Sequence, residues 1–207
     1  MVKVLNLYAG IGGNRKLWEN VDVTAVELDP KIAEIYQDFF PNDKVIVADA
    51  HQYLLDHFKE FDFIWSSPPC PSHSRMRFGL GVGRGISKPV YPDMTLYQQI
   101  LLLKHHCENK WLVENVKPYY KPLIIPTFDM YRHFFWCNFM MSAYKTDSLG
   151  TCVVLGEREF LQDEFGFDLS PYTGIDKRKA LRNCVVPELG LHIFTSAFQE
   201  DKQLELL

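Results

Sequence analysis

The sequence has no CxxC pair, no long apolar run and no excess of positive charge, and each absence excludes a class of protein. Its five cysteines are odd in number and lack paired spacing, which argues against a disulfide framework and a tetrahedral zinc site. The longest apolar run is too short to cross a bilayer. The amino terminus is a short strand rather than a signal peptide, so we expect a cytoplasmic protein with no bound metal and no membrane contact.

The formal net charge is −4 over 207 residues, whereas a simple nucleic-acid coat protein would be basic. Any contact with a polyanion must therefore be local. The long connection from Pro71 to Pro92 is a candidate, because residues 63–92 include no Asp or Glu. Loops of this length are usually functional lids or disordered segments. A polyanionic substrate would suit the basic side chains of this loop, which are Arg75, Arg77, Arg84 and Lys88. A solvated flexible loop is the plain alternative.

The sequence does contain a regular alternation of apolar strands and helices. Strands are predicted over 3–13 (ending in glycines), 23–30, 44–50, 61–69 and 110–116, and helices over 14–21, 31–40, 53–60 and 96–107. Uniformly apolar strands that alternate with helices are typical of a parallel sheet covered on both faces. The predicted fold class is α/β, with a doubly wound, mostly parallel sheet. Residues 138–174 break the alternation with short strand-like pieces and turns, and are interpreted as a small insertion.

Unusual residues follow the predicted strands at their carboxyl ends, where doubly wound sheets bind ligands. A glycine run at 10–13 follows the first strand but lacks the GxGxxG spacing of a dinucleotide site. Glu27 follows the second strand, where an acid commonly accepts from ribose hydroxyls, and Asp49 follows the third, where it can accept from an exocyclic amine. A glycine turn is often only a turn, and a strand-end acid is often a helix cap. In this order, the three features favour an adenosine-containing cofactor.

Cys70 follows the fourth strand in the stretch SSPPCPSHSRM, where the prolines stiffen the backbone. Most free cysteines are buried inert thiols. The strand-end position and the basic loop argue otherwise, since nearby positive charge would lower the thiol pKa. His73 could act as a base but is more simply a loop residue. Glu114 ends the fifth strand, where it could simply cap the next element. If it does more, a thiolate at Cys70 and an acid at Glu114 suit nucleophilic attack on an electron-poor ring with protonation of a ring nitrogen.

Taken in order, these motifs resemble those of the cytosine-C5 methyltransferases that use S-adenosylmethionine. LYAGIGG resembles the first motif, with Tyr8 in place of the usual Phe, and VELDP and ADA resemble the second and third. SPPC resembles the catalytic Pro-Cys motif, TLYQQI the helix after it, VENV the Glu-Asn-Val motif and RNCVVP the carboxyl-terminal motif. The resemblance covers most of the chain and implies a Rossmann-like S-adenosylmethionine-dependent methyltransferase fold.

The resemblance also implies a reaction. Cys70 thiolate would add to C6 of a cytosine flipped out of double-stranded DNA, Glu114 would protonate or hydrogen-bond N3, and Arg132 would help to hold Glu114 or the base. C5 would then receive the methyl group of the cofactor, which would leave as S-adenosylhomocysteine, while the 71–92 loop closes over the base. The implied cofactor-binding residues are Tyr8, Ala9, Gly10, Gly12, Gly13, Glu27, Leu28, Asp49, Ala50, Pro69, Leu96 and Asn183.

The chain departs from the family pattern in two ways. The Gln-x-Arg-x-Arg motif is reduced, with Arg132 matching the last arginine and Met130 replacing the first. The expected organisation is a cofactor-binding and catalytic domain at 1–136, a target-recognition region at 137–175 and a segment at 176–207 that packs back. So small a recognition region predicts a short or loose sequence context, and a partner chain or dimer would be one way to complete it. Small enzymes of this pattern look like those of bacteriophages, which implies protection of a phage genome against restriction.

The same residues also bear on other functions. An exocyclic-amine methyltransferase has an aromatic residue where Cys70 stands and gives Glu114 no role. A zinc cytidine deaminase needs H-x-E before P-C-x-x-C, and here both the order and the ligands fail. A non-catalytic nucleic-acid or partner-binding relative would need neither Cys70 nor Glu114. An RNA-directed enzyme of the same chemistry stays open, although the sequence has no RNA-binding module.

Overall fold

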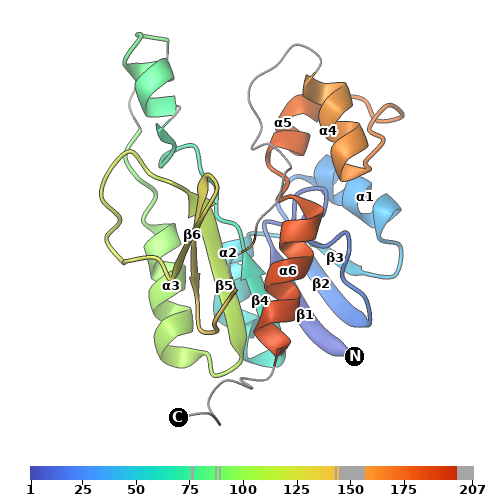
Figure 1. Ribbon diagram of the computed structural model, residues 1–207. Helices are drawn as coiled ribbons and strands as arrows, with labels where there is room; N and C mark the ends of the chain where they lie inside the picture. Colours follow the sequence, from blue (N-terminus) through green and yellow to red (C-terminus); the bar gives the residue numbers. More distant parts are fainter. Residues whose placement is uncertain (76, 87, 89, 143, 145–156, 200–207) are drawn as a thin grey trace.

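A computed structural model describes residues 1–75, 77–86, 88, 90–142, 144 and 157–199 of the chain (Figure 1). The elements are, in chain order, β1 (Val2–Leu7), β2 (Val21–Glu27), α1 (Pro30–Phe39), β3 (Lys44–Val47), α2 (Ala50–His57), η1 (Phe58–Glu60), β4 (Phe63–Ser66), η2 (Arg77–Val82), α3 (Thr95–His106), β5 (Lys110–Val116), β6 (Phe128–Met130), β7 (His133–Cys137), α4 (Glu157–Phe165), α5 (Lys177–Arg182) and α6 (Pro187–Phe198).

The strands form one seven-stranded sheet in the order β3-β2-β1-β4-β5-β7-β6. The first five strands in the sequence pair in parallel, and the β6–β7 hairpin joins antiparallel to β5. The chain crosses from the β3 edge back to β4, beside β1, so the strand order reverses between β1 and β4. The predicted doubly wound, mostly parallel, Rossmann-like fold is confirmed, and its switch point is where such sheets bind ligands.

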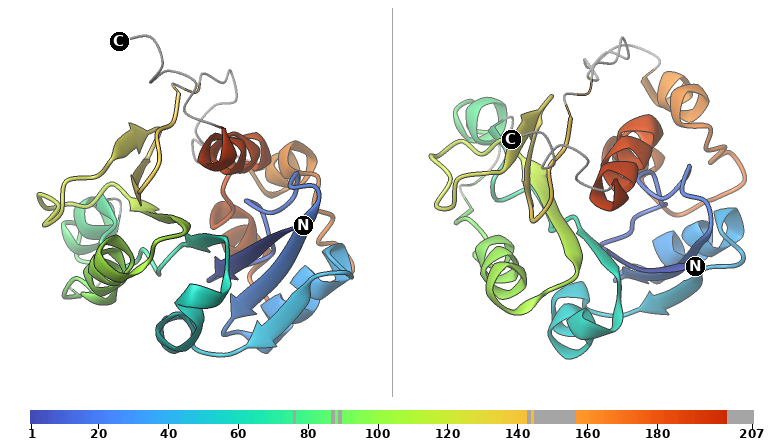
Figure 2. Two further views of the ribbon diagram at one scale, coloured as in Figure 1. Left: turned by 90° about the horizontal axis from the view of Figure 1, so that it is seen from below. Right: turned by 60° about the horizontal axis from the view of Figure 1, so that its bottom comes forward.

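Helices cover both faces of this sheet (Figure 2). On one face α2 and α3 bury apolar side chains such as Leu54 and Ile100 against the strands. On the other face α6 buries Leu189 and Ile193 against β4, β5 and β7. Alternate strand residues therefore belong to two separate apolar cores, which explains why the strands read as uniformly apolar.

The predicted strands and three of the four predicted helices are confirmed, but the predicted helix over 14–21 is wrong. Residues 12–18 form successive turns, with the Arg15 amide bonded to the Gly12 carbonyl and the Trp18 amide to the Arg15 carbonyl. A helix returning along a strand roughly 20 Å long needs about 13 residues at 1.5 Å each, and too few remain before β2. The sheet face there is covered instead by α6, where Trp18 stacks on Phe194 at 5.1 Å.

The prediction of strand-like pieces and turns over 138–174 is also wrong for part of that region. Residues 157–165 form α4, because Leu161 and Phe165, one helical turn apart, both face an apolar cluster. The cluster includes Ile11 after β1 and Ile35 of α1, so α4 packs on the same unit as the sheet. Residues 145–156 lie outside the described part of the chain. Within the described part, no helix has the length and apolar character needed to cross a membrane.

Candidate active site

The glycine turn after β1 is tied to Glu27 at the end of β2. The Glu27 carboxylate accepts hydrogen bonds from the amides of Gly10 at 3.0 Å, Leu28 at 2.9 Å and Asp29 at 3.0 Å. These bonds fix an acidic group at the carboxyl edge of the sheet, beside the switch point. Leu28 is 66% exposed and offers an apolar surface next to the carboxylate.

The three glycines of the turn differ in what surrounds them. Gly10 has φ +56°, and a Cβ placed on it would meet nothing within 4 Å, so its backbone is open to a ligand. A Cβ on Gly12 would lie 2.3 Å from the Phe40 ring, and one on Gly13 would lie 2.6 Å from the Cys184 Cβ. The close approach at Gly12 and Gly13 is therefore to the chain itself, and only Gly10 faces open space.

The remaining predicted cofactor residues surround the same edge in two groups. Asp49 is exposed and caps α2 through a bond from the Gln52 amide, and Pro69 and Asn183 are also exposed. The side chains of Ala9, Ala50 and Leu96 are instead buried in apolar cores. A ligand at this edge would therefore contact the side chains of Asp49, Pro69 and Asn183. It would contact Ala9 and Ala50 through their backbone.

A buried polar network lies beneath this edge. Gln99 of α3 is fully buried, donates to the Tyr8 hydroxyl at 2.7 Å and accepts from the Ser66 hydroxyl at 2.6 Å. Its amide nitrogen also lies 3.3 Å from Nδ1 of His51. Burial raises the pKa of Tyr8 to about 12, so its hydroxyl stays protonated at neutral pH. The network joins the glycine turn, the end of β4 and the starts of α2 and α3.

Cys70 lies four residues beyond the end of β4, and its carbonyl accepts from the amides of His73 and Ser74, both at 3.0 Å. The expectation of a lowered thiol pKa is wrong. Burial and, next, the charge of Glu114 raise the pKa of Cys70, and the opposing charges of Arg132 and Lys179 are outweighed. The resting cysteine is therefore mainly a protonated thiol at neutral pH.

Glu114 lies within β5, the strand next to β4, and is 7% exposed. Its Oε2 atom is buried and has no hydrogen-bond partner among the described residues. Nε2 of His133, on β7, lies 3.9 Å from that oxygen. The neighbouring Asn115 donates to the Pro68 carbonyl at 2.9 Å, which ties β5 to the prolines before Cys70. The predicted pair of thiol and acid is thus brought together by adjacent parallel strands.

Arg132 lies in the turn between β6 and β7. Its guanidinium donates to the Arg182 carbonyl at the end of α5, at 3.1 Å, and its charge acts on both Cys70 and His133. Arg132 therefore links the hairpin to the carboxyl-terminal segment beside the thiol.

The C-5 cytosine-specific DNA methylase family model matches residues 2–122, more than half of the 207-residue chain. The chain belongs to this family. A comparison with curated proteins gave no match.

Several solved structures are similar to the chain. A Spodoptera frugiperda DNMT2 mutant shares 23% identity at a TM-score of 0.40, over 56% of this chain and 36% of that one. A putative DNA modification methyltransferase encoded within an Escherichia coli prophage shares 20% identity at a TM-score of 0.37, over 58% and 34%. The putative methyltransferase yhhF from Escherichia coli shares 16% identity at a TM-score of 0.42, over 66% and 74%. This chain thus spans little more than a third of the DNMT2 and prophage chains.

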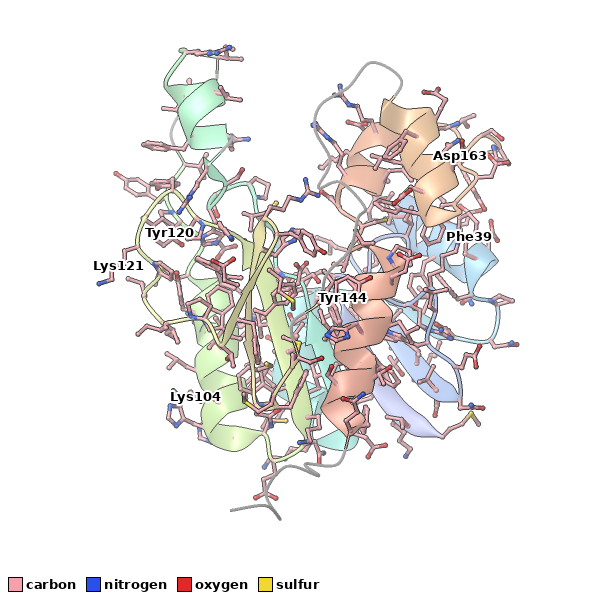
Figure 3. The ribbon with its side chains drawn as sticks, viewed as in Figure 1. Phe39, Lys104, Tyr120, Lys121, Tyr144 and Asp163 are labelled. Atoms are coloured by element: carbon pink, nitrogen blue, oxygen red, sulfur yellow. The ribbon has the colours of Figure 1, made fainter. Side chains whose placement is uncertain are left out.

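In this family member, the segment after Cys70 is an arm that projects from the carboxyl edge of the sheet and carries η2 (Figure 1). Phe78 stacks on Tyr119 at 4.1 Å, and Arg75 donates to the Pro118 carbonyl at 2.7 Å. His73 is 1% exposed, and its Nδ1 contacts the hydroxyl of Tyr120, at the base of the arm (Figure 3). Burial lowers the pKa of His73. Its buried side chain anchors the arm and is not an accessible base.

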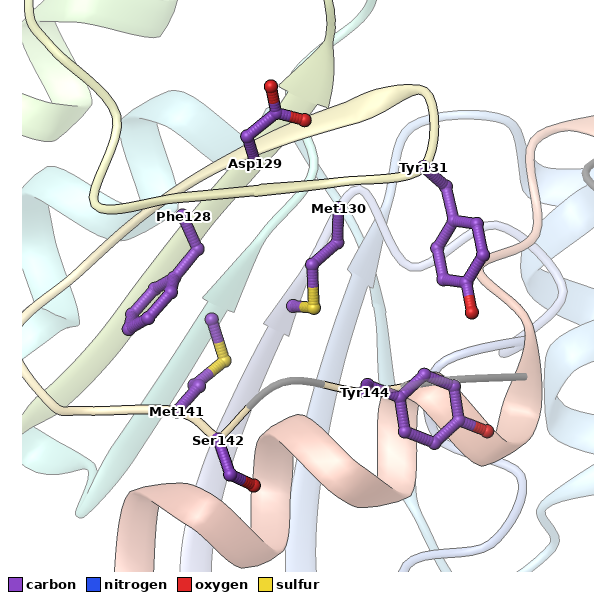
Figure 4. Close-up of a pocket in the computed structure, with 7 residues that line it drawn as sticks. All are labelled: Phe128, Asp129, Met130, Tyr131, Met141, Ser142 and Tyr144. Carbon is purple, nitrogen blue, oxygen red and sulfur yellow. The ribbon is translucent and has the colours of Figure 1, made fainter.

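A pocket lies beside the reduced arginine motif. Met130, which the resemblance aligns with the first arginine of that motif, points into it together with Phe128 and Tyr131 (Figure 4). The segment after β7 forms the opposite wall, with Met141, Ser142 and Tyr144. Met130 and Phe128 also pack on the α6-side core, so this position of the hairpin is apolar.

Three site residues were missed by the sequence analysis. Gln99 lies in TLYQQI, where the resemblance points only to Leu96; a polar residue at an otherwise buried helix position is the available signal. Lys179 acts on Cys70 from a segment more than a hundred residues later, and the basic run KRKALR was its only signal. His133 follows Arg132 directly, but only the β5–β7 pairing places it against Glu114.

Proposed function

We propose that this protein is a DNA (cytosine-5-)methyltransferase that transfers a methyl group from S-adenosylmethionine to C5 of a flipped cytosine. The observation that carries the proposal is geometric: Cys70, which follows β4, and the buried acid Glu114 of the adjacent parallel strand β5 meet at one edge of the sheet, where Asn115 bonds to the Pro68 carbonyl just before Cys70. A non-catalytic binding protein needs no such pair. Membership of the family supports the same chemistry.

The carboxyl edge of the sheet fits the proposed cofactor. Glu27 is held by three backbone amides and retains acceptor capacity for ribose hydroxyls, and Gly10 leaves room for close approach. Leu28 would cover an adenine face, and Asp49 would accept from its amino group. When bound, S-adenosylmethionine supplies the methyl group.

The chain's own residues would then act on the base. After its thiol proton passes to solvent, Cys70 forms a bond to C6 as the thiolate, and the electrons of the C5–C6 double bond move towards the N3 side of the ring. Glu114 stabilises that charge by donating a proton to N3. C5 becomes nucleophilic and takes the methyl group. Transfer of the C5 proton to water, with return of the N3 proton to Glu114, expels Cys70 as the thiolate and restores the C5–C6 double bond.

The coupling between the two side chains helps the first step. Because the Glu114 charge raises the Cys70 pKa, neutralising Glu114 must lower it. The reaction needs Glu114 as an acid and Cys70 as a thiolate at the same time, and the acid form of Glu114 carries no charge that would oppose the thiolate. Arg132 and Lys179 add positive charge that stabilises the thiolate.

Double-stranded DNA is the proposed partner. The arm and α5 stand on either side of the carboxyl edge (Figure 1). The arm carries Arg75, Arg77, Arg84 and Lys88, and α5 carries Lys177, Arg178, Lys179 and Arg182. Phosphate contacts from both sides would position the duplex over Cys70. Residues 137–175 are the proposed target-recognition region, with a partner chain or dimer as a means of completing it. Protection of a bacteriophage genome against restriction is the proposed biological role.

The test is transfer of labelled methyl from S-adenosylmethionine to cytosine-containing duplex DNA, with tRNA and free dCMP in parallel, followed by base-resolution mapping. Label at C5 of cytosine in DNA supports the proposal, and label only in RNA moves the substrate while keeping the chemistry. Cys70→Ala should abolish transfer and leave cofactor binding intact, whereas Cys107→Ala, at the far end of α3, should retain activity. Full activity in Cys70→Ala would contradict the assignment.

A further inference from the structure

His133 stands beside the proposed catalytic acid because of the strand register. Glu114 of β5 pairs with Phe135 of β7, and Val116 pairs with His133. His133 is two residues from Phe135 on β7, so its side chain lies on the same face of the sheet as those of Phe135 and Glu114. Such diagonal pairs on antiparallel strands are within reach of long side chains. Glu114 and His133 are therefore diagonal neighbours on the face that α6 covers.

The contact between them is nearly dry. The side chains of His133 and Glu114 are 15% and 9% exposed, and Nε2 of the imidazole lies 3.9 Å from Oε2 of the carboxyl group. That oxygen is the one without a hydrogen-bond partner among the described residues. A buried carboxyl oxygen left without a partner is costly, so a donor within one small side-chain movement has a clear use.

The imidazole is itself held in place. Its ring meets the Phe135 ring edge-on at 6.3 Å, and Met130 pairs with His133 across the hairpin. Burial lowers the pKa of His133 most strongly, the Glu114 charge opposes this, and Arg132 and Lys117 add to the lowering. The ring is therefore neutral at pH 7, with one nitrogen able to donate and the other able to accept.

We propose that His133 is a positioning residue for Glu114: its Nε2–H holds Oε2, so that the other carboxyl oxygen faces the ring nitrogen of the bound cytosine. The inference rests on the proposed function. It gives His133 the task of orienting the acid in a chain where Met130 replaces an arginine and Arg132 reaches towards α5. His133 does not touch the substrate, and no proton leaves it during the reaction.

Turnover is the first test. His133→Ala should lower kcat about 100-fold, the usual cost of misplacing a catalytic group, with little change in the KM for S-adenosylmethionine. His133→Gln should restore most of the rate, because its terminal amide can donate from a similar position. His105→Ala, at the exposed end of α3, is the matched control. If kcat in His133→Ala equals that of the wild type, the role of His133 is overturned.

A second measurement does not depend on activity. The ring nitrogens of His133, followed by NMR through a pH titration, should titrate at lower pH in Glu114→Gln, since the carboxylate favours the protonated ring. Glu60→Gln, which removes the partner of His57, should leave the His133 titration unchanged. Unchanged His133 signals in Glu114→Gln would overturn the contact. A wild-type protein inactive on every substrate would instead overturn the proposed function.

Discussion

The amide nitrogen of Gln99 donates to the hydroxyl of Tyr8 at 2.7 Å, and the amide oxygen of Gln99 accepts from Ser66 at 2.6 Å. One fully buried side chain thus joins the turn that faces the cofactor edge to the strand that leads to Cys70. Tyr8 adopts φ +55°, a conformation that costs energy in a residue other than glycine. The hydrogen bond from Gln99 holds this side chain in place.

Tyr8→Phe keeps the aromatic ring but removes one partner of a buried amide. We expect a loss of about 1 kcal/mol in the free energy of unfolding, which lowers Tm by about 2–4 °C in a chain of this size. Thermal unfolding monitored by circular dichroism measures it. Tyr91→Phe, at a site that is 95% exposed, should show no change. Equal Tm values for Tyr8→Phe and the wild type would show that the network contributes nothing to stability.

Glu114→Gln should make Cys70 more reactive towards alkylation. The Glu114 charge raises the Cys70 pKa, so its removal lowers that pKa and moves the pH profile of the alkylation rate to lower pH. The measurement is the rate of Cys70 modification by iodoacetamide across pH, read by mass spectrometry so that the other thiols are separated. The same variant should lose methyl transfer, because N3 then has no acid. A profile at unchanged or higher pH would contradict the electrostatic coupling.

Gly10→Ala and Gly12→Ala form a matched pair, since both glycines have positive φ. Each alanine should cost about 1–2 kcal/mol for the left-handed conformation. Gly12→Ala also forces a Cβ against the Phe40 ring, so about 1–3 kcal/mol more should be lost in that variant. Chemical denaturation gives both values. Gly10→Ala should keep the fold and weaken S-adenosylmethionine binding. Equal destabilisation of the two variants would mean that the Phe40 ring moves away from the new Cβ at little cost in free energy.

Glu27→Ala removes a carboxylate that accepts from three backbone amides and would accept from the ribose. Because hydrogen bonds to a charged group contribute about 1.5–3 kcal/mol each, affinity for S-adenosylmethionine should fall roughly 10–100-fold. Isothermal titration calorimetry measures the affinity, and Glu19→Ala, exposed before β2, is the control. Unchanged affinity in Glu27→Ala would remove Glu27 from the cofactor site.

The strand–helix alternation, and with it the fold class, was predictable because parallel strands buried on both faces are uniformly apolar. The carboxyl ends of the strands are predictable from the same pattern, which places Glu27, Asp49, Cys70 and Glu114 along one edge of the sheet. The family motifs supplied their proposed roles. These features depend on residues close together in the sequence, where local patterns are informative.

Other features required the tertiary structure. Too few residues remain between β1 and β2 for the helix predicted over 14–21 to return along the strand. Instead α6, from the other end of the chain, covers that face of the sheet. The sign of the Cys70 pKa shift depends on how burial and Glu114 compare with Arg132 and Lys179, which are distant in sequence. His133 meets Glu114 only through an antiparallel register. Sequence alone determined which chemical groups stand at the strand ends. Burial and long-range pairing decided the protonation state of Cys70 and the neighbours of Glu114, because both depend on contacts that the local pattern does not encode.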